Sequence, residues 1–306
     1  MKRSISFALL IFGFSLAIVM LPAISGGTVQ AHKQIQGISR SVITRNVPCG
    51  VGALKGGYGV QVKGNILAAP PALPRSYGAV MLVTFDGFGK YTARGMANTD
   101  GNQTDIVETG IYLVNYDCTG LMRGPVFDYN LVFSKDMNEF DLVFASKAGP
   151  MTPIPTVLNG VGKKVAPYEV GRTSLEWAIN YTCSPGSILG QWSTIFEGTA
   201  YQGVPLPPGP FRGVGILEYK SPGDIIGTYF GVYGGVYLAF PFTGKMAFVN
   251  SDCTAIGYGD NGGPSAFQVL VNGGRESLGL GIYPSGVPSP PEGFGVQTVA
   301  TSKRIR

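Results

Sequence analysis

Carboxylates are the side chains of this 306-residue sequence best suited to acid or base chemistry. Glu197 and Glu218 fall on two successive expected strands of the second half, and Glu108 falls near the start of an expected strand in the first half. A carboxylate that points into an apolar interior has a raised pKa and can transfer a proton near neutral pH. We interpret all three as outward-facing, because the positions aligned with the second-half pair hold Lys63 and Val83 in the first half.

The other residue types that catalysis commonly uses do not form a recognisable site. His32 is the only histidine, which excludes a Ser-His-Asp or Cys-His arrangement and a histidine-rich metal site. The glycine pairs at 57–59 and 293–295 lack the strand-to-helix context of a phosphate-binding loop, so we interpret them as turn or bulge glycines. The acidic turn at 260–263 lacks the later carboxylates of a calcium loop. The sequence therefore predicts no catalytic, cofactor-binding or metal-binding residues.

A short motif that contains a cysteine occurs twice. Residues 115–119 read Asn-Tyr-Asp-Cys-Thr, and residues 250–254 read Asn-Ser-Asp-Cys-Thr. The aspartate of each motif, Asp117 or Asp252, is expected to cap backbone N–H groups of a turn. The motif indicates that one module is written twice in the chain.

The cysteines predict two disulfides, since we expect the chain to reach an oxidising compartment. Four cysteines allow three pairings. Cys118 lies 69 positions after Cys49 and Cys253 lies 70 positions after Cys183, so the repeat favours these two pairs. Closing a loop of about 70 residues stabilises the folded state by about 4 kcal/mol in the chain-entropy model.

The first residues fix the expected compartment. Lys2 and Arg3 precede an apolar run at 7–21, and small residues lead to Ala31, which is the order of a secretory signal peptide over residues 1–31. The alternative is an uncleaved membrane anchor. We therefore expect a secreted or periplasmic protein with a flexible segment at 32–46 and no transmembrane segment after cleavage. Losing the two basic residues lowers the net charge from +5 to +3, too weak a bias to predict nucleic-acid binding.

Most of the remaining chain reads as short strands and turns. It contains 46 glycines and 22 prolines, and its apolar residues do not recur at helical spacing. The expected strands and hairpins lie at 78–85, 126–133 with 139–146, 213–220, 224–233 with 236–242, and 266–271 with 277–283. Such strands favour an all-β fold of two antiparallel barrels, with a β-sandwich as the alternative.

The expected domains follow from the two copies of the module. The first barrel is expected at 47–148 and the second at 182–302, separated by a linker at 149–181 that contains a short helical turn at 174–178. Two basic clusters, Lys163-Lys164 in the linker and a tail at 303–306, are expected to be solvated. Proline-rich segments at 68–74 and 204–210 suit long loops between the first two strands of each half.

These elements carry a resemblance to known proteins. An upstream cysteine, a Gly-x-Tyr strand, a strand that ends in Asp-Gly-x-Gly and a later Asn-x-Asp-Cys-Thr-Gly occur here as Cys49, 56–58, 86–89 and 115–120. This set resembles exported bacterial proteins of unassigned function that are similar to calycin-like barrels, including the allene-oxide-cyclase type. The second half departs from the pattern at 221–224 and at Ala255. The resemblance implies a barrel with an apolar cavity and implies no reaction, because no cyclase residue can be matched.

Three functions are consistent with these observations. The first is a non-enzymatic exported barrel that binds a small apolar ligand, because an eight-stranded barrel can enclose one. The second is a structural or adhesive envelope protein whose barrels are filled by their own side chains. The third is a cyclase or isomerase that acts on a hydrophobic substrate through one buried carboxylate.

Overall fold

The computed structural model describes residues 49–66, 75–125, 128–145, 156–166, 182–200, 209–221, 223–233, 235–260, 265–282 and 296–305. All of them belong to one compact unit, Asn46–Arg306. The predicted signal peptide at 1–31, the segment at 32–46 and the helical turn at 174–178 lie outside the described residues.

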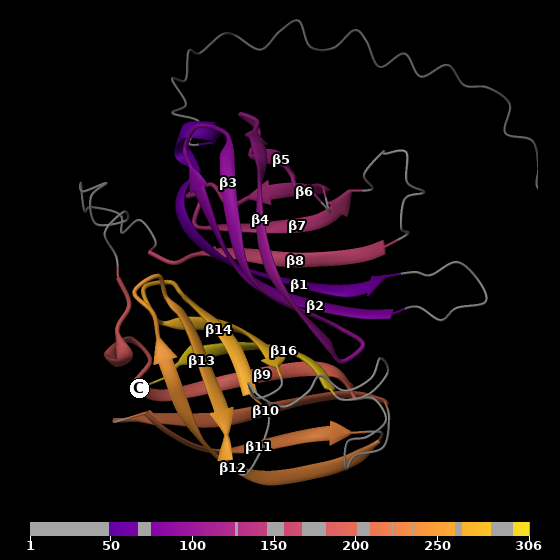
Figure 1. Cartoon of the computed structure of the whole chain (residues 1–306), viewed down its shortest axis with the longest axis vertical. Coiled ribbons are helices and arrows are strands. Elements are labelled where there is room, and N and C mark those ends of the chain that lie inside the picture. The colour runs from indigo at the N-terminus through magenta and orange to yellow at the C-terminus, as the bar shows by residue number, and fades with distance from the viewer. Residues whose placement is uncertain are drawn as a thin grey trace, which may run out of the picture. The chain divides into compact units, whose positions relative to one another are not determined.

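Eight antiparallel strands form the first barrel, and each pairs with the next along the chain (Figure 1). The strands are β1 (Lys55–Ile66), β2 (Arg75–Asp86), β3 (Lys90–Thr99), β4 (Asn102–Val114), β5 (Thr119–Arg123), β6 (Asp128–Phe133), β7 (Glu139–Ala145) and β8 (Thr156–Lys164). The barrel closes because β8 also pairs with β1, with Lys164 opposite Tyr58. A short 3-10 helix, η1 (Val51–Ala53), precedes β1.

The second barrel repeats this arrangement. Its strands are β9 (Gly190–Ala200), β10 (Gly209–Lys220), β11 (Asp224–Tyr233), β12 (Val236–Val249), β13 (Thr254–Gly259), β14 (Ser265–Val271), β15 (Glu276–Ile282) and β16 (Val296–Arg304). It closes where β16 pairs with β9, after a second 3-10 helix, η2 (Pro185–Ser187). The predicted fold class is therefore confirmed as all-β with two closed antiparallel barrels, and the sandwich alternative is wrong.

Alternation of side chains along the strands decides what fills each barrel. On β4, Tyr112 and Val114 are buried whereas Ile111 and Leu113 are exposed, as the two-residue period of a strand requires. Some glycines leave space for an aromatic ring that packs on the backbone of the neighbouring strand. A Cβ at Gly162 would lie 2.1 Å from the ring of Phe140, which is its partner on β7. Closure leaves no unpaired sheet edge in either barrel.

The repeated motif builds the same turn in both barrels. Cys118 and Cys253 both have positive φ, 66° and 72°. Asp117 Oδ1 accepts hydrogen bonds from the backbone N–H and the hydroxyl of Thr119, and Asp252 does the same for Thr254. The aspartates therefore cap the turn, as the sequence predicts.

The disulfides join the pairs that the repeated spacing favours. Cys49 is bonded to Cys118 and Cys183 to Cys253, with Cα atoms 5.1 and 4.9 Å apart. Each bond ties the segment before the first strand of a barrel to the turn that precedes that barrel's fifth strand.

Two predicted boundaries are corrected by the strands. The segment at 149–181 contains β8, so the first barrel extends beyond residue 148 and Lys163-Lys164 lies in a strand. The prolines at 150, 153 and 155 suggested a linker, but all of them precede β8. The predicted tail also begins inside a strand, because Lys303 and Arg304 belong to β16 and pair with β9.

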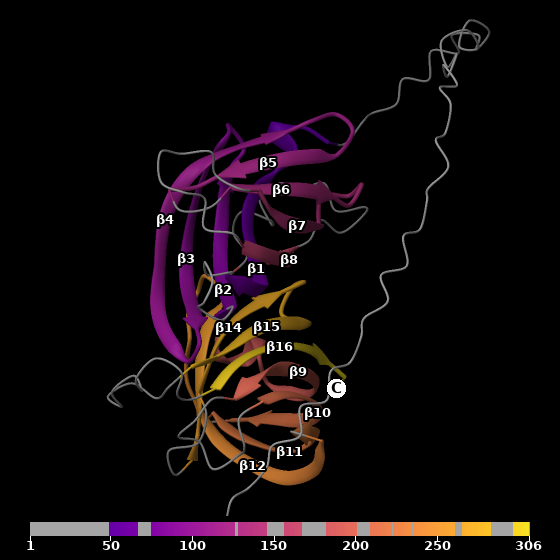
Figure 2. The ribbon, with the colours of Figure 1, turned by 90° about the vertical axis from the view of Figure 1, so that its right-hand side faces the viewer.

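The barrels contact each other through their outer faces. Val80 and Leu82, on the outside of β2, belong to one apolar cluster with Val269, Val271 and Val299 of β14 and β16. The backbone N–H groups of residues 272 and 273 donate to the carbonyls of residues 164 and 165, at 2.9 and 2.8 Å. Figure 2 shows the strands of each barrel from a second direction.

Candidate functional site

Aromatic rings fill one end of the first barrel. Phe85 lies at the centre, with its ring centroid 4.9 Å from that of Tyr112, 5.4 Å from Tyr58 and 6.3 Å from Phe140. All four side chains are almost fully buried. Tyr58 donates to the carbonyl of Met137 at 2.6 Å, which satisfies its hydroxyl. This end of the barrel is a packed core and offers no site.

Glu108 faces the interior of the first barrel, where it meets tyrosines. It is half-buried on β4, and the hydroxyl of Tyr91 donates to its Oε1 at 3.1 Å. Burial raises the pKa of Glu108, although this hydrogen bond opposes the shift. Burial and the nearby carboxylate also raise the pKa of Tyr77 to about 12 and raise the pKa values of Tyr91 and Tyr129. The group is therefore one carboxyl that can exchange a proton, among phenols that remain neutral.

The prediction that Glu108 faces outward is wrong. The sequence of β4 has apolar residues on both sides, so the strand's orientation could not be determined without its partners. The outward set of this strand includes Val107, which is among the most exposed large hydrophobic residues described.

Glu197 and Glu218 lie on the outer faces of β9 and β10. Glu197 forms ion pairs with Lys63 of the first barrel and with Arg212, the latter at 3.2 Å. Glu218 lies 3.5 Å from Lys220 on the same strand. Neither carboxylate enters a barrel, so a site built from these two residues does not form.

The second barrel is closed at the end that contains Trp192. The indole N–H of Trp192 donates to the carbonyl of Ile188 at 2.7 Å, and its ring contacts Tyr219. Gln268 links this layer by accepting from Ser277 at 3.1 Å and by its long contact of 3.4 Å with the hydroxyl of Tyr219. These side chains are buried, so the inner layer is satisfied by its own contacts.

The remainder of the second barrel holds aromatic rings that are only half-buried. Phe196 contacts Phe211 and Tyr229, with ring centroids 6.0 and 5.1 Å apart, and Phe242 lies 5.4 Å from Tyr229. Their strand positions face inward, yet Phe196, Phe211, Tyr229 and Phe242 all keep part of their surface accessible. These four residues, together with Tyr233, are called here the aromatic end of the second barrel.

Tyr233 adds a polar atom to the aromatic end. Its ring stacks on that of Phe211, with centroids 5.4 Å apart and planes 17° apart. The residue is 5% exposed, and its hydroxyl oxygen has no hydrogen-bond partner within the part of the chain that the structure describes. A buried hydroxyl without a partner is costly, which makes this oxygen a natural contact for a bound molecule.

Glycines in the barrel wall make room for these rings. A Cβ at Gly213 would lie 2.3 Å from the ring of Phe196, and one at Gly215 would lie 2.4 Å from the ring of Tyr229. The rings therefore rest directly on backbone, and the inward glycines add no side-chain volume to the barrel.

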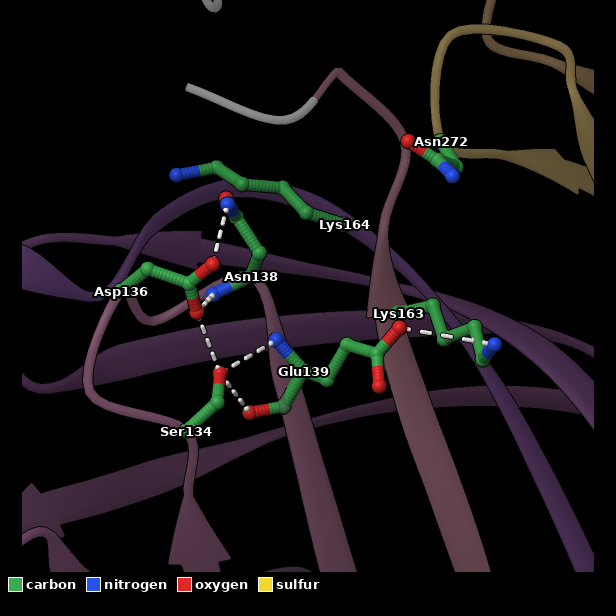
Figure 3. Close-up of a pocket in the computed structure, with 7 residues that line it drawn as sticks. All are labelled: Ser134, Asp136, Asn138, Glu139, Lys163, Lys164 and Asn272. Atoms are coloured by element: carbon green, nitrogen blue, oxygen red, sulfur yellow. Dashed lines mark hydrogen bonds and ion pairs between the residues drawn. The ribbon is translucent and has the colours of Figure 1, made fainter. Parts of the chain in front are cut away.

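A polar pocket of about 260 Å³ lies outside the barrel interiors (Figure 3). It is lined by Ser134, Asp136, Asn138, Glu139, Lys163, Lys164 and Asn272. Asp136 holds the turn together by accepting from Ser134 at 2.6 Å and from the amide of Asn138 at 2.9 Å. The pocket thus has a wall whose polar groups already serve the β6–β7 turn.

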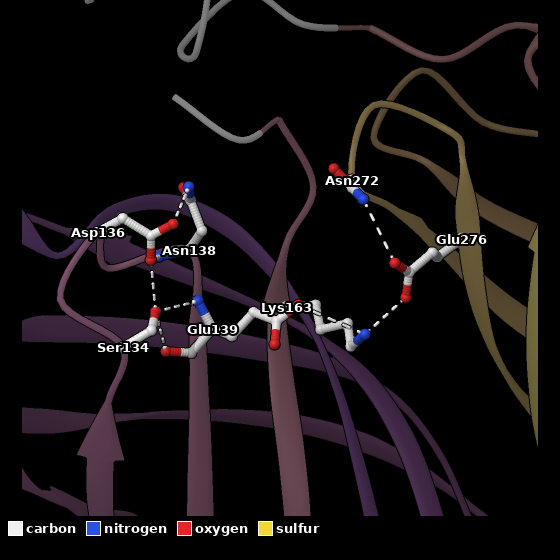
Figure 4. Close-up of polar contacts among 7 residues, drawn as sticks. All are labelled: Ser134, Asp136, Asn138, Glu139, Lys163, Asn272 and Glu276. Carbon is white, nitrogen blue, oxygen red and sulfur yellow. Dashed lines mark hydrogen bonds and ion pairs between the residues drawn. The ribbon is translucent and has the colours of Figure 1, made fainter. Parts of the chain in front are cut away.

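Lys163 connects the two barrels at this pocket. Its Nζ lies 2.6 Å from Glu276 and 3.5 Å from Glu139, which are carboxylates of different barrels (Figure 4). Burial alone would lower the pKa of Lys163, but the hydrogen bonds and charges of both carboxylates outweigh burial and raise it. The same contacts lower the pKa of Glu276 against the effect of its own burial.

Lys164 points the opposite way, into the closed end of the first barrel. It is 2% exposed, and its Nζ lies 5.5 Å from the centroid of the Tyr58 ring. Burial lowers the pKa of Lys164 to about 8. The expectation that both lysines are solvated is wrong, because β8 places one against two carboxylates and the other over an aromatic core. The amine nitrogen of Lys164 is shielded from solvent, so it is not placed for nucleophilic chemistry.

Among the described residues, no group of three or more His, Cys, Asp or Glu side chains could hold a metal ion. No helix in the described part of the chain is long and apolar enough to span a membrane.

Comparison with known proteins adds little to this geometry. No protein-family model and no curated protein sequence matches the chain. Among solved structures, the chain is similar to a protein of unknown function from the DUF3598 family of Nostoc punctiforme PCC 73102. That similarity has 10% sequence identity and a TM-score of 0.27, and it covers 82% of this chain and 96% of the other.

Proposed function

We propose that this chain is an exported, non-enzymatic protein whose second barrel binds a small apolar molecule. The observation that carries the proposal is the aromatic end, where four inward rings remain half-buried beside a buried hydroxyl without a partner among the described residues. Apolar walls with a few polar groups are the usual composition of small-molecule sites. The ligand is therefore an aromatic or aliphatic molecule with one polar group that reaches the hydroxyl of Tyr233.

A titration with fluorescent apolar probes tests this function. A fluorescent fatty acid and an aromatic probe with one polar group should both bind with micromolar affinity. Tyr233→Phe should weaken binding of the probe that carries the polar group by about fivefold to tenfold, because one hydrogen bond is lost. Tyr237→Phe is the matched control, since Tyr237 is exposed on the outer face of the next strand. An absence of binding at high micromolar concentration, or equal effects of the two variants, would contradict the proposal.

Export rests on the sequence of the first 31 residues and on the two disulfides. An oxidising compartment is where such bonds form and persist. Fractionation of producing cells, followed by N-terminal sequencing, should find a chain that begins at His32 outside the cytoplasm. Recovery of the full chain from the cytoplasm with free thiols would exclude export.

Proton transfer in the first barrel is the second candidate function. Glu108 favours it, because its pKa is raised by burial and because Tyr91 orients one of its oxygens. A cyclase or isomerase acting on a hydrophobic substrate can use such a carboxyl as its general acid or base. If a turnover is found, Glu108→Gln should abolish it, whereas Glu218→Gln on the outer face should not affect it.

A further inference from the structure

The contact between the barrels joins two different faces. The outer face of β1–β3 packs against the outer face of β14–β16, and Val80 and Leu82 supply its apolar centre from the first barrel. Gln61 donates from β1 to the carbonyls of Ala300 and Gly279, at 2.9 and 3.3 Å. Because the two partners use different strands, this interface is heterologous, and such a contact can repeat without closing.

Each face has a counterpart in the other barrel. Tyr58 lies opposite Val83, and its counterpart Trp192 lies opposite Leu217. The strands β9–β11 are therefore equivalent to β1–β3, and Val83 corresponds to Leu217, not to Glu218 as the sequence alignment had it. By the same register, Val214 and Ile216 of the second barrel occupy the positions that Val80 and Leu82 hold in the first. The strands β6–β8 of the first barrel are likewise equivalent to β14–β16 of the second. Among the described residues, the strands of the other barrel do not pack on the outer faces of β9–β11 and of β6–β8. Only Glu197 of β9 and Lys163 of β8 reach the other barrel, each through an ion pair.

The outer face of β9–β11 is apolar although it is exposed. Ile195, Val214 and Phe230 lie directly opposite one another on three neighbouring strands, and Ile195 is 64% exposed. Ile216 and Val232 extend this row on either side. A contiguous apolar surface of this kind marks an interaction site. It has the same position in its barrel as the apolar centre of the existing interface.

The outer face of β6–β8 also exposes apolar side chains. Val132, Val143 and Val157 are all exposed, one on each strand. Val143 lies between Asn130 and Asn159 in the register of the sheet. The exposed carboxylate of Asp141 lies opposite Val132 on the same face, at the position that Leu278 holds in the second barrel. This face is thus a mixed surface of valines and polar side chains, and it is equivalent to the face that receives the first barrel within the chain.

The charges at the two faces are complementary when the interface is repeated. Within the chain, Lys63 pairs with Glu197, its equivalent position, and Lys163 pairs with Glu276. Register makes Lys303 equivalent to Lys163 and Glu139 equivalent to Glu276. Between copies, Lys303 would therefore meet Glu139, a contact of opposite charges that favours this register over others. The other equivalent pair, Glu197 with Lys63, adds no new contact, because these side chains already pair within each chain.

We propose that copies of this chain associate head to tail, with the outer face of β9–β11 of one copy packed against the outer face of β6–β8 of the next. The interface between barrels is then continued from chain to chain. A heterologous contact of this kind produces assemblies larger than a dimer, as rings or as filaments. The occupant of both exposed faces is a second copy of the same chain.

Sedimentation velocity of the purified protein over the micromolar range tests the association. The weight-average mass should grow with concentration beyond that of two chains. Phe230→Asp should raise the apparent dissociation constant about tenfold or more, because it places a charge at the centre of the contact. Val107→Asp is the matched control: Val107 is 86% exposed on β4, outside both faces, so its variant should associate as the unmodified chain does. If Phe230→Asp melts at a lower temperature than the control, Ile195→Asp replaces it.

A mixing experiment separates head-to-tail contact from a symmetric dimer. Phe230→Asp blocks one face and Val143→Asp blocks the other, so each variant alone should remain monomeric. A mixture of the two should form a one-to-one dimer that grows no further. A chain that stays monomeric at high micromolar concentration overturns the proposal, as does a closed dimer of the unmodified chain or a mixture that does not associate.

Discussion

The two barrels have the same strand order but different interiors. In the first, the rings of Phe85 and its neighbours are buried on all sides, whereas in the second the rings of Phe196, Phe211 and Phe242 stay half-buried. Register gives the reason. Counting from the equivalent residues Val83 and Leu217, glycines occupy the positions of Ala79 and Met81 in the second barrel. The second barrel therefore lacks side-chain volume at places where the first has a methyl group or a methionine.

The polar groups inside the barrels differ as well. Glu108 pairs with Ala93, and the equivalent pair in the second barrel is Gly227 with Phe242. An acid in one barrel is thus replaced by a ring in the other. A common scaffold supports a packed interior with one titratable group in the first case and a half-exposed aromatic surface in the second. The two interiors therefore differ in chemistry although the strand order is the same.

Removing each disulfide should give the largest change in stability, and it tests whether the two barrels depend equally on this bond. The loops they close differ by one residue, so Cys49→Ser/Cys118→Ser and Cys183→Ser/Cys253→Ser should each lower the free energy of unfolding by about 4 kcal/mol. Urea denaturation followed by tryptophan fluorescence and circular dichroism measures both. If only one double variant loses stability, the disulfide of the other barrel contributes little to its free energy of unfolding. The two barrels would then not be equivalent in what stabilises them.

Truncation of one ring in each barrel tests the difference in packing. Phe85→Ala should lower the free energy of unfolding by about 4 kcal/mol, because a buried ring leaves a cavity. Phe211→Ala should cost about 1–2 kcal/mol, since this ring is half-buried and loses less surface. Urea denaturation of both variants gives the comparison. Equal costs would show that the aromatic end of the second barrel is packed as tightly as the core of the first.

The sequence predicted the hairpins from short-range turn signals, and it predicted the disulfides from the repeated spacing of 69 and 70 positions between cysteines. Asp86-Gly87 marks the end of β2, where a strand was expected to end. Residues 272–275 join β14 to β15, as in the hairpin expected from 266–271 and 277–283. The sequence could not predict which side of a strand faces inward, since β4 is apolar on both sides and a register shift of one residue reverses the direction of every side chain. The aromatic end was not predicted, because its residues come from four strands that only the barrel brings together. Lys163 and Lys164 were assigned to a solvated linker because prolines lie nearby in the sequence. In the structure they belong to β8, where successive side chains point to opposite sides of the sheet.

The buried amine of Lys164 gives a test at the closed end of the first barrel. Its pKa of about 8 in the folded state is below the ordinary value of 10.5, so stability should rise as the pH increases from about 8 to 10.5. Lys164→Met should raise the free energy of unfolding at pH 7 by about 2 kcal/mol, because a buried charge is removed. At pH 10.5 the two proteins should differ much less. A variant that is less stable at pH 7 would show that contacts with the Tyr58 ring and Asp136 outweigh the burial cost.

Glu108 provides the corresponding test inside the same barrel, with the opposite sign. Burial raises its pKa above the ordinary value of 4.5, so the stability it contributes is present at pH 4 and is lost as the pH rises through the folded-state pKa. Glu108→Gln should remove this loss and raise the free energy of unfolding at pH 8. The two proteins should converge near pH 4, where the carboxyl is neutral in both folded and unfolded states. Glu218→Gln, on the outer face of β10, is the control for the same substitution outside the barrel. If Glu108→Gln instead destabilises the protein equally at both pH values, the carboxyl is a structural hydrogen-bond partner of Tyr91, and the second candidate function loses its titratable group.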